Sequence, residues 1–428
     1  MRKQFDPRIN RRDALKTIGM ASAVLAARPL ASIASIGSSP TPLRMRRVDV
    51  GVLLPLMSSA PASRSLLAGM QLYLDMAGTT VAGRSIRLIP EDTGRSVGQA
   101  VAKARKLMER DNAGLVVGLV NPAATHWLRD IFTENRGVFL EVNAGEKIAD
   151  RKNFSPQIFR NTLSYWEASH AMGIWAARNL GRRTVIASSF RESGYDAIRA
   201  FRRGFEVAGG TVVEMCVTGS PIAPETPAGI MKRIAGAAPD FVCALYAQEE
   251  ACEFVDAYNR AGLGGRLPLV GSGFMTSEGL LGELGGEAVG IMSGFSWSEQ
   301  LRNEANNEFV AAYRRTTGNR ADAFALLGYE SAQIVAKAIE LAGGDTGRSS
   351  RLMSAFRKLE IESPRGPIAF SRSTQSITSP LYVRQVRSNG GTLANTVIAT
   401  LDHISTPERI QLASLDTNRG WMNPYLAV

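Results

Sequence analysis

The chain has 428 residues, of which 45% are hydrophobic and 21% are charged. Its formal net charge of +11 would suit a protein that binds nucleic acid. However, residues 1–47 hold ten Lys and Arg against two Asp and Glu, which leaves 40 basic and 37 acidic residues in 48–428. This longer segment is nearly neutral, and its basic residues form no run beyond pairs. The composition therefore argues against a nucleic-acid partner.

The N-terminal segment has the pattern of an export signal. The sequence RRDALKTIGMASAVLAA begins with Arg11 and Arg12, and its apolar part spans only Ile18–Ala27. A membrane-spanning helix needs roughly 20 apolar residues, about twice that length. A basic start, a short apolar run and small residues after it predict an export signal and its flank over 1–47. The arginine pair resembles a twin-arginine signal; a basic disordered N-terminus is the alternative.

The three cysteines give no disulfide framework. Cys216, Cys243 and Cys252 are odd in number, and no two of them have C-x-x-C spacing. The sequence leaves open whether two of them form one disulfide bond. None lies near residue 35, where a lipid-anchored protein would need a cysteine after its signal. We therefore expect an exported protein without a lipid anchor, located in the periplasm.

The roughly 380 residues after the leader are too many for one ordinary core and suggest two domains. From Val48, short apolar runs alternate with segments of helical periodicity: VDVGVLLP, SIRLIPED, AGLVVGLV and GVFLEV are strand-like, with helical stretches between them. Strands that are apolar throughout are typical of a parallel sheet with both faces covered. The pattern predicts an α/β domain.

A second series of the same kind begins after FRNTLSYW, which ends at Trp166. The strand-like runs RTVIASS, TVVEMCV, PDFVCALY and PLVGSG alternate with helical segments. Two further helices, NNEFVAAYRRTTG and GYESAQIVAKAIELAGG, follow, and the second ends at Gly343 and Gly344. The strand-like runs GPIAFS and LYVRQV come next. The tail 403–428 shows no clear pattern.

The order of these segments resembles a known family. The chain contains, in sequence order, VGVLLPLMSSA with LLAGMQLYLDMAG, AVAKARKLMERDNAGLVVG, PDFVCALYAQEEACEFVDAYNRAGL, ALLGYESAQIVAKAIELAGG and RGPIAF. Together they resemble the leucine/isoleucine/valine-type periplasmic solute-binding proteins of ABC importers over nearly all of 48–402. Each segment is weak alone, whereas five in register are specific.

The resemblance implies the type I periplasmic binding protein fold, in which two doubly wound parallel-sheet lobes are joined by three hinge crossings. We expect the crossings near 157–163, 293–299 and 378–384. Lobe one would then comprise 48–160 plus 298–380, and lobe two 161–297 plus 381–402. In such a fold the solute contacts both lobes and favours their closure.

The resemblance also implies a binding site at strand ends in lobe one. The family holds a solute carboxylate with hydroxyl and backbone N–H groups of such loops. Here the two loops that match this role contain Asn121, Ala124 and Thr125, and Asn143, Ala144 and Gly145; Ser58 and Ser59, after the first strand, are further candidates at a strand end. Family members often carry serines where this chain has Pro122, Ala123 and Ala124. Backbone donors survive that change and hydroxyl donors do not, which puts the anionic end of the solute in doubt.

Lobe two contributes Tyr195, Tyr246 and Glu249 to the expected site. In the family an acidic residue pairs with the solute's amino group, and Glu249 falls at the matching offset. The alternative is that Glu249 only occupies the first turn of a helix, where the dipole favours it. Trp166 belongs either to the pocket floor or to the lobe core. Trp297 is expected to pack at the hinge, with a place in the cleft as the alternative.

Nothing in the sequence indicates catalysis or a cofactor. His126, His170 and His403 have no metal-ligand spacing, and the GLGG run at 262–265 follows a helix rather than a strand. We therefore expect a non-enzymatic subunit that captures a small polar solute, an amino acid or amide, for ABC permease subunits in the membrane. The alternative is a sensor of the same fold that reports to a receptor or regulator.

Overall fold

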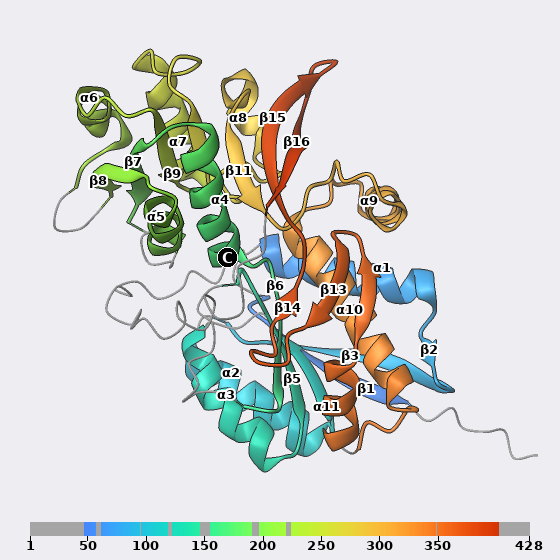
Figure 1. Ribbon diagram of the computed structural model, residues 1–428. Helices are drawn as coiled ribbons and strands as arrows, with labels where there is room; N and C mark the ends of the chain where they lie inside the picture. Colours follow the sequence, from blue (N-terminus) through green and yellow to red (C-terminus); the bar gives the residue numbers. More distant parts are fainter. Residues whose placement is uncertain are drawn as a thin grey trace, which may run out of the picture. The chain divides into compact units, whose positions relative to one another are not determined.

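The computed structural model describes residues 47–56, 61–94, 96–118, 122–145, 155–190, 197–219, 224–347 and 349–401. Across these residues strands alternate with helices (Figure 1). The predicted export signal with Arg11 and Arg12, and the tail 403–428, lie outside the described residues.

The first sheet has six strands in the order β2-β3-β1-β4-β5-β6. They are β1 (Val48–Leu54), β2 (Thr80–Val81), β3 (Arg84–Asp92), β4 (Leu115–Gly118), β5 (Val138–Asn143) and β6 (Ile158–Thr162). Neighbouring strands are parallel except for the pair β2 and β3. Because the order runs outward from β1 in both directions, this sheet is doubly wound.

The second sheet has seven strands in the order β16-β15-β11-β10-β9-β7-β8. They are β7 (Arg183–Ser189), β8 (Thr211–Thr218), β9 (Phe241–Leu245), β10 (Leu269–Gly271), β11 (Met292–Phe295), β15 (Leu381–Asn389) and β16 (Thr392–Leu401). Strands β7 to β11 are parallel, whereas β15 and β16 add an antiparallel hairpin at the edge.

The remaining elements are a small antiparallel sheet and the helices. The small sheet consists of β12 (Glu360–Ser363), β13 (Gly366–Phe370) and β14 (Ile377–Thr378). The helices are α1 (Pro61–Ala77), α2 (Val97–Arg105), η1 (Lys106–Arg110), α3 (Pro122–Glu134), α4 (Tyr165–Asn179), α5 (Ala197–Val207), α6 (Pro227–Gly236), α7 (Gln248–Arg260), α8 (Leu281–Leu284), η4 (Gly285–Ala288), α9 (Glu304–Thr317), α10 (Ala323–Leu341) and α11 (Ser349–Arg357).

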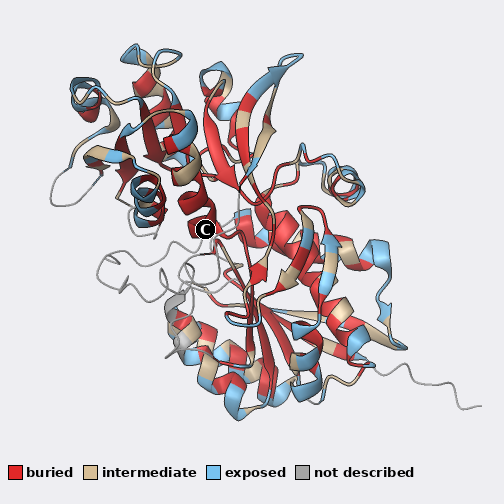
Figure 2. Ribbon diagram, viewed as in Figure 1, coloured by how far each residue is buried: buried red, intermediate tan, exposed pale blue. Residues whose placement is uncertain are grey.

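The central strands of both large sheets are buried on both faces, as Figure 2 shows. In the first sheet, alternate residues of β1, β4 and β5 pack against α1 and α10 on one side and against α2 and α3 on the other. In the second sheet, β7, β9 and β10 pack against α4 and α5 on one face and α6 and α7 on the other. The continuous apolar strand runs of the sequence therefore reflect helices on both faces.

Two lobes follow from this packing. The first lobe is the first sheet with α1, α2, α3, α9, α10, α11 and the small sheet; the second lobe is the second sheet with α4 to α8. The chain passes between them three times, in segments that we call the linkers: after β6, after β11 and before β15. The predicted α/β fold of two doubly wound lobes joined by three crossings is confirmed. The predicted domain boundaries stay a prediction.

Apart from short elements such as β2, β12 and β14, one helix begins earlier than predicted and two longer elements were not predicted. Helix α10 begins at Ala323, five residues before the predicted GYESA segment, because Asp322 caps its N-terminus by accepting a hydrogen bond from the Ala325 N–H at 2.7 Å. Helix α11 and strand β16 were not predicted. The β15–β16 turn uses Gly390 and Gly391, both with positive φ, so an N-G-G turn signal was present in the sequence.

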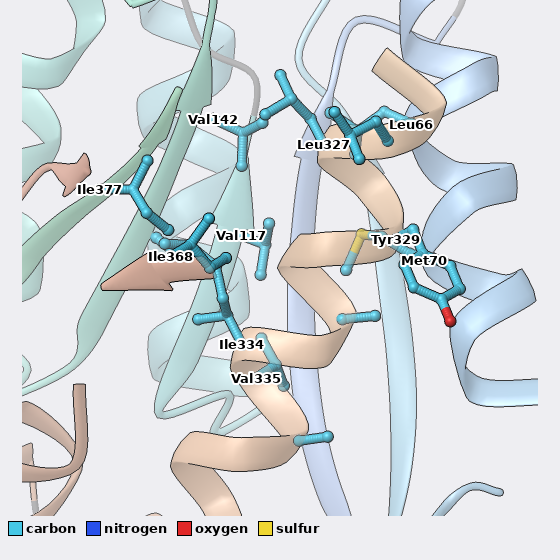
Figure 3. Packing of buried hydrophobic residues seen from close by; sticks show 14 of the residues in the cluster. Leu66, Met70, Val117, Val142, Leu327, Tyr329, Ile334, Val335, Ile368 and Ile377 are labelled. Carbon is cyan, nitrogen blue, oxygen red and sulfur yellow. The ribbon is translucent and has the colours of Figure 1, made fainter. Parts of the chain in front are cut away.

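Helices α1 and α10 pack unusually closely over the first sheet, and Figure 3 shows Leu66 of α1 beside Leu327 of α10. The close approach depends on glycine. A Cβ added at Gly328 would lie 1.9 Å from the Leu66 carbonyl oxygen, and one added at Gly69 would lie 2.0 Å from the Ala325 carbonyl oxygen. Backbone atoms cannot yield as a flexible side chain can, so these two glycines fix the helix spacing.

We predict that Gly328→Ala lowers the free energy of unfolding by about 3 kcal/mol, because the new methyl group forces the two helices apart. The matched control is Gly236→Ala in α6, where an added Cβ would meet no atom within 4 Å. That exposed change should raise stability by about 0.5 kcal/mol. Urea unfolding of both variants measures the difference; equal effects would contradict the packing argument.

Candidate functional site

Two of the predicted binding residues meet at the carboxyl ends of β4 and β5. Thr125 lies in the first turn of α3, and Asn143 ends β5. The Thr125 hydroxyl donates to Glu141 Oε1 at 2.9 Å, and Asn143 Nδ2 donates to the same oxygen at 3.0 Å. The structure thus brings both residues together through a buried carboxylate that the sequence analysis did not single out.

Glu141 is almost completely buried and pairs with an equally buried arginine. Its Oε2 lies 2.9 Å from Arg160 Nε, and the exposed fractions of the two side chains are 4% and 8%. A charge inside the apolar run GVFLEV requires a partner, because an unpaired charge is costly to bury. This was the signal in the sequence that could have identified Glu141.

The loop after β5 is fastened by its own hydrogen bonds. The Gly145 N–H donates to Asn143 Oδ1 at 2.8 Å, and the carbonyls of Ala144 and Gly145 accept from the first two N–H groups of α4. Gly145 has φ of +88°, and an added Cβ would lie 2.5 Å from the Ser164 nitrogen. The start of the second lobe is therefore built directly on this loop.

These bonds decide what the loop can offer to a solute. A threonine hydroxyl has one proton, and in Thr125 that proton points to Glu141. The Gly145 N–H is likewise used by Asn143. To donate to a solute carboxylate, either group must exchange its present partner. Ala124 and Ala144, with exposed fractions of 1% and 7%, contribute no polar side chain.

In the second lobe, the structure places Tyr246 in the core rather than at an exposed surface. It follows β9, its ring stacks on Phe254 with centroids 4.4 Å apart, and its hydroxyl accepts a hydrogen bond from Thr218 at 3.1 Å. Burial raises the pKa of Tyr246. The sequence placed Tyr246 correctly after a strand but could not show that its hydroxyl has an internal partner.

Glu249 is exposed in the first turn of α7. In the part of the chain that the structure describes, no cation forms an ion pair with its carboxylate. At this position the Glu249 carboxylate interacts favourably with the positive end of the α7 dipole, and it is also accessible to an ammonium group of a solute. The other predicted residues, Ser58, Ser59, Asn121 and Tyr195, lie outside the described residues.

Several aromatic side chains gather where the two lobes join. Phe274, between β10 and α8, packs against hydrophobic residues of both lobes; its ring centroid lies 5.0 Å from that of Tyr165 and 6.2 Å from that of Phe324. Trp166, with 7% exposure, is buried but is not part of any hydrophobic cluster formed by the described residues. Phe274 was not identified from the sequence.

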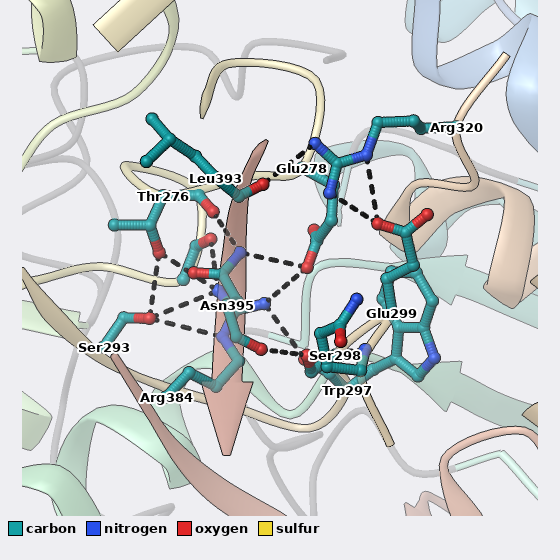
Figure 4. A network of polar contacts seen from close by, with 12 residues as sticks. Thr276, Glu278, Ser293, Trp297, Ser298, Glu299, Arg320, Arg384, Leu393 and Asn395 are labelled. Atoms are coloured by element: carbon teal, nitrogen blue, oxygen red, sulfur yellow. Dashed lines mark hydrogen bonds and ion pairs between the residues drawn. The ribbon is translucent and has the colours of Figure 1, made fainter. Parts of the chain in front are cut away.

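Trp297 lies in the linker after β11 and is completely buried. Its indole Nε1–H donates to Asn306 Oδ1 at 2.8 Å, and its ring contacts Phe309 of α9. The residue therefore packs at the hinge. Its neighbour Ser298 donates to the carbonyl of Asn395 in β16 (Figure 4), so this linker is tied to the edge hairpin of the second sheet.

A second buried arginine supports the same linker. Arg384 of β15 pairs with Glu278 at 3.2 Å and donates to the Trp297 carbonyl at 3.0 Å, as Figure 4 shows. Asn395 Nδ2 also donates to Glu278. Burial raises the pKa of Glu278 and lowers that of Arg384, with their mutual attraction opposing both shifts. The contacts of Arg384 hold the linker against the second sheet.

All three cysteines are free, which answers the question that the sequence left open. Burial raises the pKa of Cys216 to about 11, so its thiol stays protonated at neutral pH. The described residues contain no group of three or more His, Cys, Asp or Glu side chains placed to hold a metal ion. None of the described helices has the length and apolar character needed to span a membrane.

A family model described as periplasmic binding protein matches residues 47–391. The chain belongs to this family. Among curated proteins, a Leu/Ile/Val-binding protein homolog from Brucella suis is 26% identical over 367 residues, which cover 84% of this chain and 93% of that protein. The predicted family resemblance is confirmed.

Solved structures agree with this assignment. An ABC transporter substrate-binding protein from Sphaerobacter thermophilus is 29% identical, with a TM-score of 0.78 and coverage of 84% of this chain and 98% of that one. A solute-binding protein of an ABC transporter from Rhodopseudomonas palustris, solved with 3,4-dihydroxybenzoic acid, is 26% identical, with a TM-score of 0.75 and coverage of 85% and 99%. The protein is thus a substrate-binding protein of the ABC transporter family.

We predict that Glu141→Gln lowers the free energy of unfolding of this binding protein by about 3 kcal/mol, because it leaves Arg160 buried without a counter-charge. The control is Glu206→Gln, which breaks the exposed pair with Arg202 in α5 and should change stability very little. Thermal and urea unfolding measure both. Equal stabilities of the two variants would show that the buried pair does not matter for folding.

Proposed function

We propose that this periplasmic binding protein captures a small organic carboxylate outside the cytoplasm and delivers it to an ABC permease. The observation that carries the proposal is a chemical feature shared by the solutes in its relatives' names. The Brucella protein is named for leucine, isoleucine and valine, and two Rhodopseudomonas palustris proteins were solved with 3,4-dihydroxybenzoic acid and benzoate. All of these solutes join one carboxylate to an apolar body.

Within this class, an amino acid is our first candidate. Glu249 supports it, because an exposed carboxylate without an ion-pair partner among the described residues can pair with an ammonium group. The solute would lie between the lobes, near the ends of β4 and β5 and the start of α7. Closure of the lobes on the solute would then produce the form that a permease recognises.

An aromatic acid is the second candidate, and Trp166 is the specific observation in its favour. Trp166 is buried, and its backbone N–H donates to the Gly145 carbonyl at 3.2 Å, which places the residue next to the loop of Asn143–Gly145. An indole at this position, beside the loop after β5, is the kind of side chain that stacks on an aromatic solute.

A thermal-shift panel tests the solute class. It would contain leucine, isoleucine, valine, small amides, urea, benzoate and 4-hydroxybenzoate. A solute present at 100 times its Kd should raise the free energy of unfolding by about 2.7 kcal/mol. We expect one member of the carboxylate set to do so and calorimetry to give one-to-one stoichiometry. Stabilisation by urea or an amide alone would contradict the carboxylate proposal.

Glu249→Gln separates the two candidates. If Glu249 pairs with an ammonium group, the variant should bind an amino acid at least tenfold more weakly, a change of about 1.4 kcal/mol, and should bind benzoate unchanged. Glu253→Gln, which alters an exposed carboxylate farther along α7, is the control. Unaltered amino-acid affinity in Glu249→Gln, measured by calorimetry, would remove this residue from the site.

For export, we propose the twin-arginine route. Replacing Arg11 and Arg12 with lysine keeps the charge of the leader and removes the guanidinium pair. The variant should accumulate as uncleaved precursor in the cytoplasm, as judged by fractionation and the mass of the product. Normal amounts of processed protein in the periplasm would instead assign export to the general route.

A further inference from the structure

Arg365, in the turn between β12 and β13, is a completely buried arginine with every guanidinium proton used. Its Nε donates to Glu330 Oε1 at 2.8 Å, and Nη2 donates to Glu330 Oε2 at 2.6 Å. Nη2 also donates to Asn161 Oδ1 at 2.8 Å, while Nη1 donates to the Thr162 carbonyl at 2.7 Å and to Ser296 Oγ at 3.3 Å. Five contacts account for its five N–H donors.

These contacts reach all three linkers. Asn161 and Thr162 end β6, immediately before the first linker, and Ser296 begins the second linker after β11. At the third linker, the Tyr382 hydroxyl donates to the Arg365 carbonyl at 2.8 Å, and Tyr382 is the second residue of β15. Through its guanidinium and its carbonyl oxygen, Arg365 therefore contacts a residue in or directly beside each of the three linkers.

The first contact also leads to the predicted binding loop. Thr162 Oγ1 accepts a hydrogen bond from the Ser164 N–H at 3.2 Å. Leu163, which lies between these two residues, donates its N–H to the Asn143 carbonyl at 3.3 Å. Gly145 packs against Ser164 so closely that no Cβ fits. A shift of Thr162 would therefore move the loop of Asn143–Gly145 and the first turn of α4 with it.

Only arginine can make this set of contacts. The guanidinium is planar and binds the Glu330 carboxylate with two parallel bonds while its remaining protons point to the linkers. A lysine has three donors on one atom and cannot reach the carboxylate and both linkers together. Glu330 lies in α10, inside the core of the first lobe, so the guanidinium is anchored to a rigid element.

We propose that Arg365 is a positioning residue for solute capture, which holds the three linkers in register as the pivot about which the lobes close. The proposal rests on the proposed function, since it assumes that solute closes the lobes. Within the described part of the chain, no sheet connects all three linkers to one another, and the Arg365 contacts supply that connection. As a pivot it keeps its partners in both states, so lobe closure remains a rotation of intact lobes.

The test compares Arg365→Lys with the wild type in two measurements. Calorimetry gives the Kd for L-leucine, or for benzoate if the wild type binds only benzoate. Small-angle X-ray scattering gives the decrease in radius of gyration at saturating solute. We expect the variant to bind at least tenfold more weakly and to show less than half of the wild-type decrease.

Ile234→Ala is the matched control, because it removes a completely buried side chain from α6 in the second lobe, away from the linkers. It lowers Tm without touching the pivot, so it should keep wild-type affinity and the full decrease in radius of gyration. If it loses both properties in the same way, Arg365 acts only through general stability and the proposal is overturned.

Tyr382→Phe keeps the proposal testable if Arg365→Lys does not fold. It removes a single hydroxyl at the start of β15, beside the third linker, without leaving a charge buried, and we expect at least threefold weaker binding with little change in Tm. Wild-type affinity in this variant, or in a folded Arg365→Lys, overturns the proposed role of Arg365 and leaves the proposed function intact. A wild type that binds solute without any decrease in radius of gyration overturns lobe closure itself, and the pivot with it.

Discussion

Each passage of the chain between the two lobes includes buried residues, and their polar groups must find partners inside the protein. This constraint explains why charged residues occur deep in the structure. Arg365 with Glu330 and Arg384 with Glu278 are both almost completely inaccessible to solvent. Both arginines also bond to residues at the linkers: Arg365 donates to the Thr162 carbonyl and to Ser296, and Arg384 donates to the Trp297 carbonyl. Apolar substitutes could fill these spaces but could not hold the backbone of the linkers.

The same constraint acts on the loop at the end of β5. The buried Glu141 gathers Thr125 and Asn143, and the carbonyls of the loop accept the first N–H groups of α4. The loop is thus part of the joint between the lobes as well as part of the predicted binding site. Because its donors are already engaged, a solute must compete with internal partners, which makes binding sensitive to small movements of the joint.

Much of the fold could be predicted from the sequence. Continuous apolar runs between helical segments indicate strands covered on both faces, and five family segments in order indicate two lobes. The start of α10 and the edge hairpin were harder to predict. Asp322 caps α10 and extends it by five residues, and β16 depends on pairing with β15 rather than on a strong apolar pattern of its own.

The candidate site was predictable only in part, because strand ends can be located from a pattern but side-chain partners cannot. Thr125 and Asn143 were found, whereas Glu141 between them was not, since its role depends on Arg160 in the neighbouring strand. Tyr246 followed a strand as expected, yet its hydroxyl turns to Thr218 inside the lobe. Arg365 begins the family segment RGPIAF, but its role could not be predicted, because it depends on contacts with residues at three linkers that are distant in sequence.

The most direct test of lobe closure about Arg365 is a pair of crystal structures, one without solute and one with solute bound. If Arg365 is the pivot, the lobes rotate toward each other as intact bodies while Arg365 keeps its bonds to Glu330, Thr162 and Ser296 in both structures. A solute held by one lobe alone, or a rotation that breaks these bonds, would contradict it.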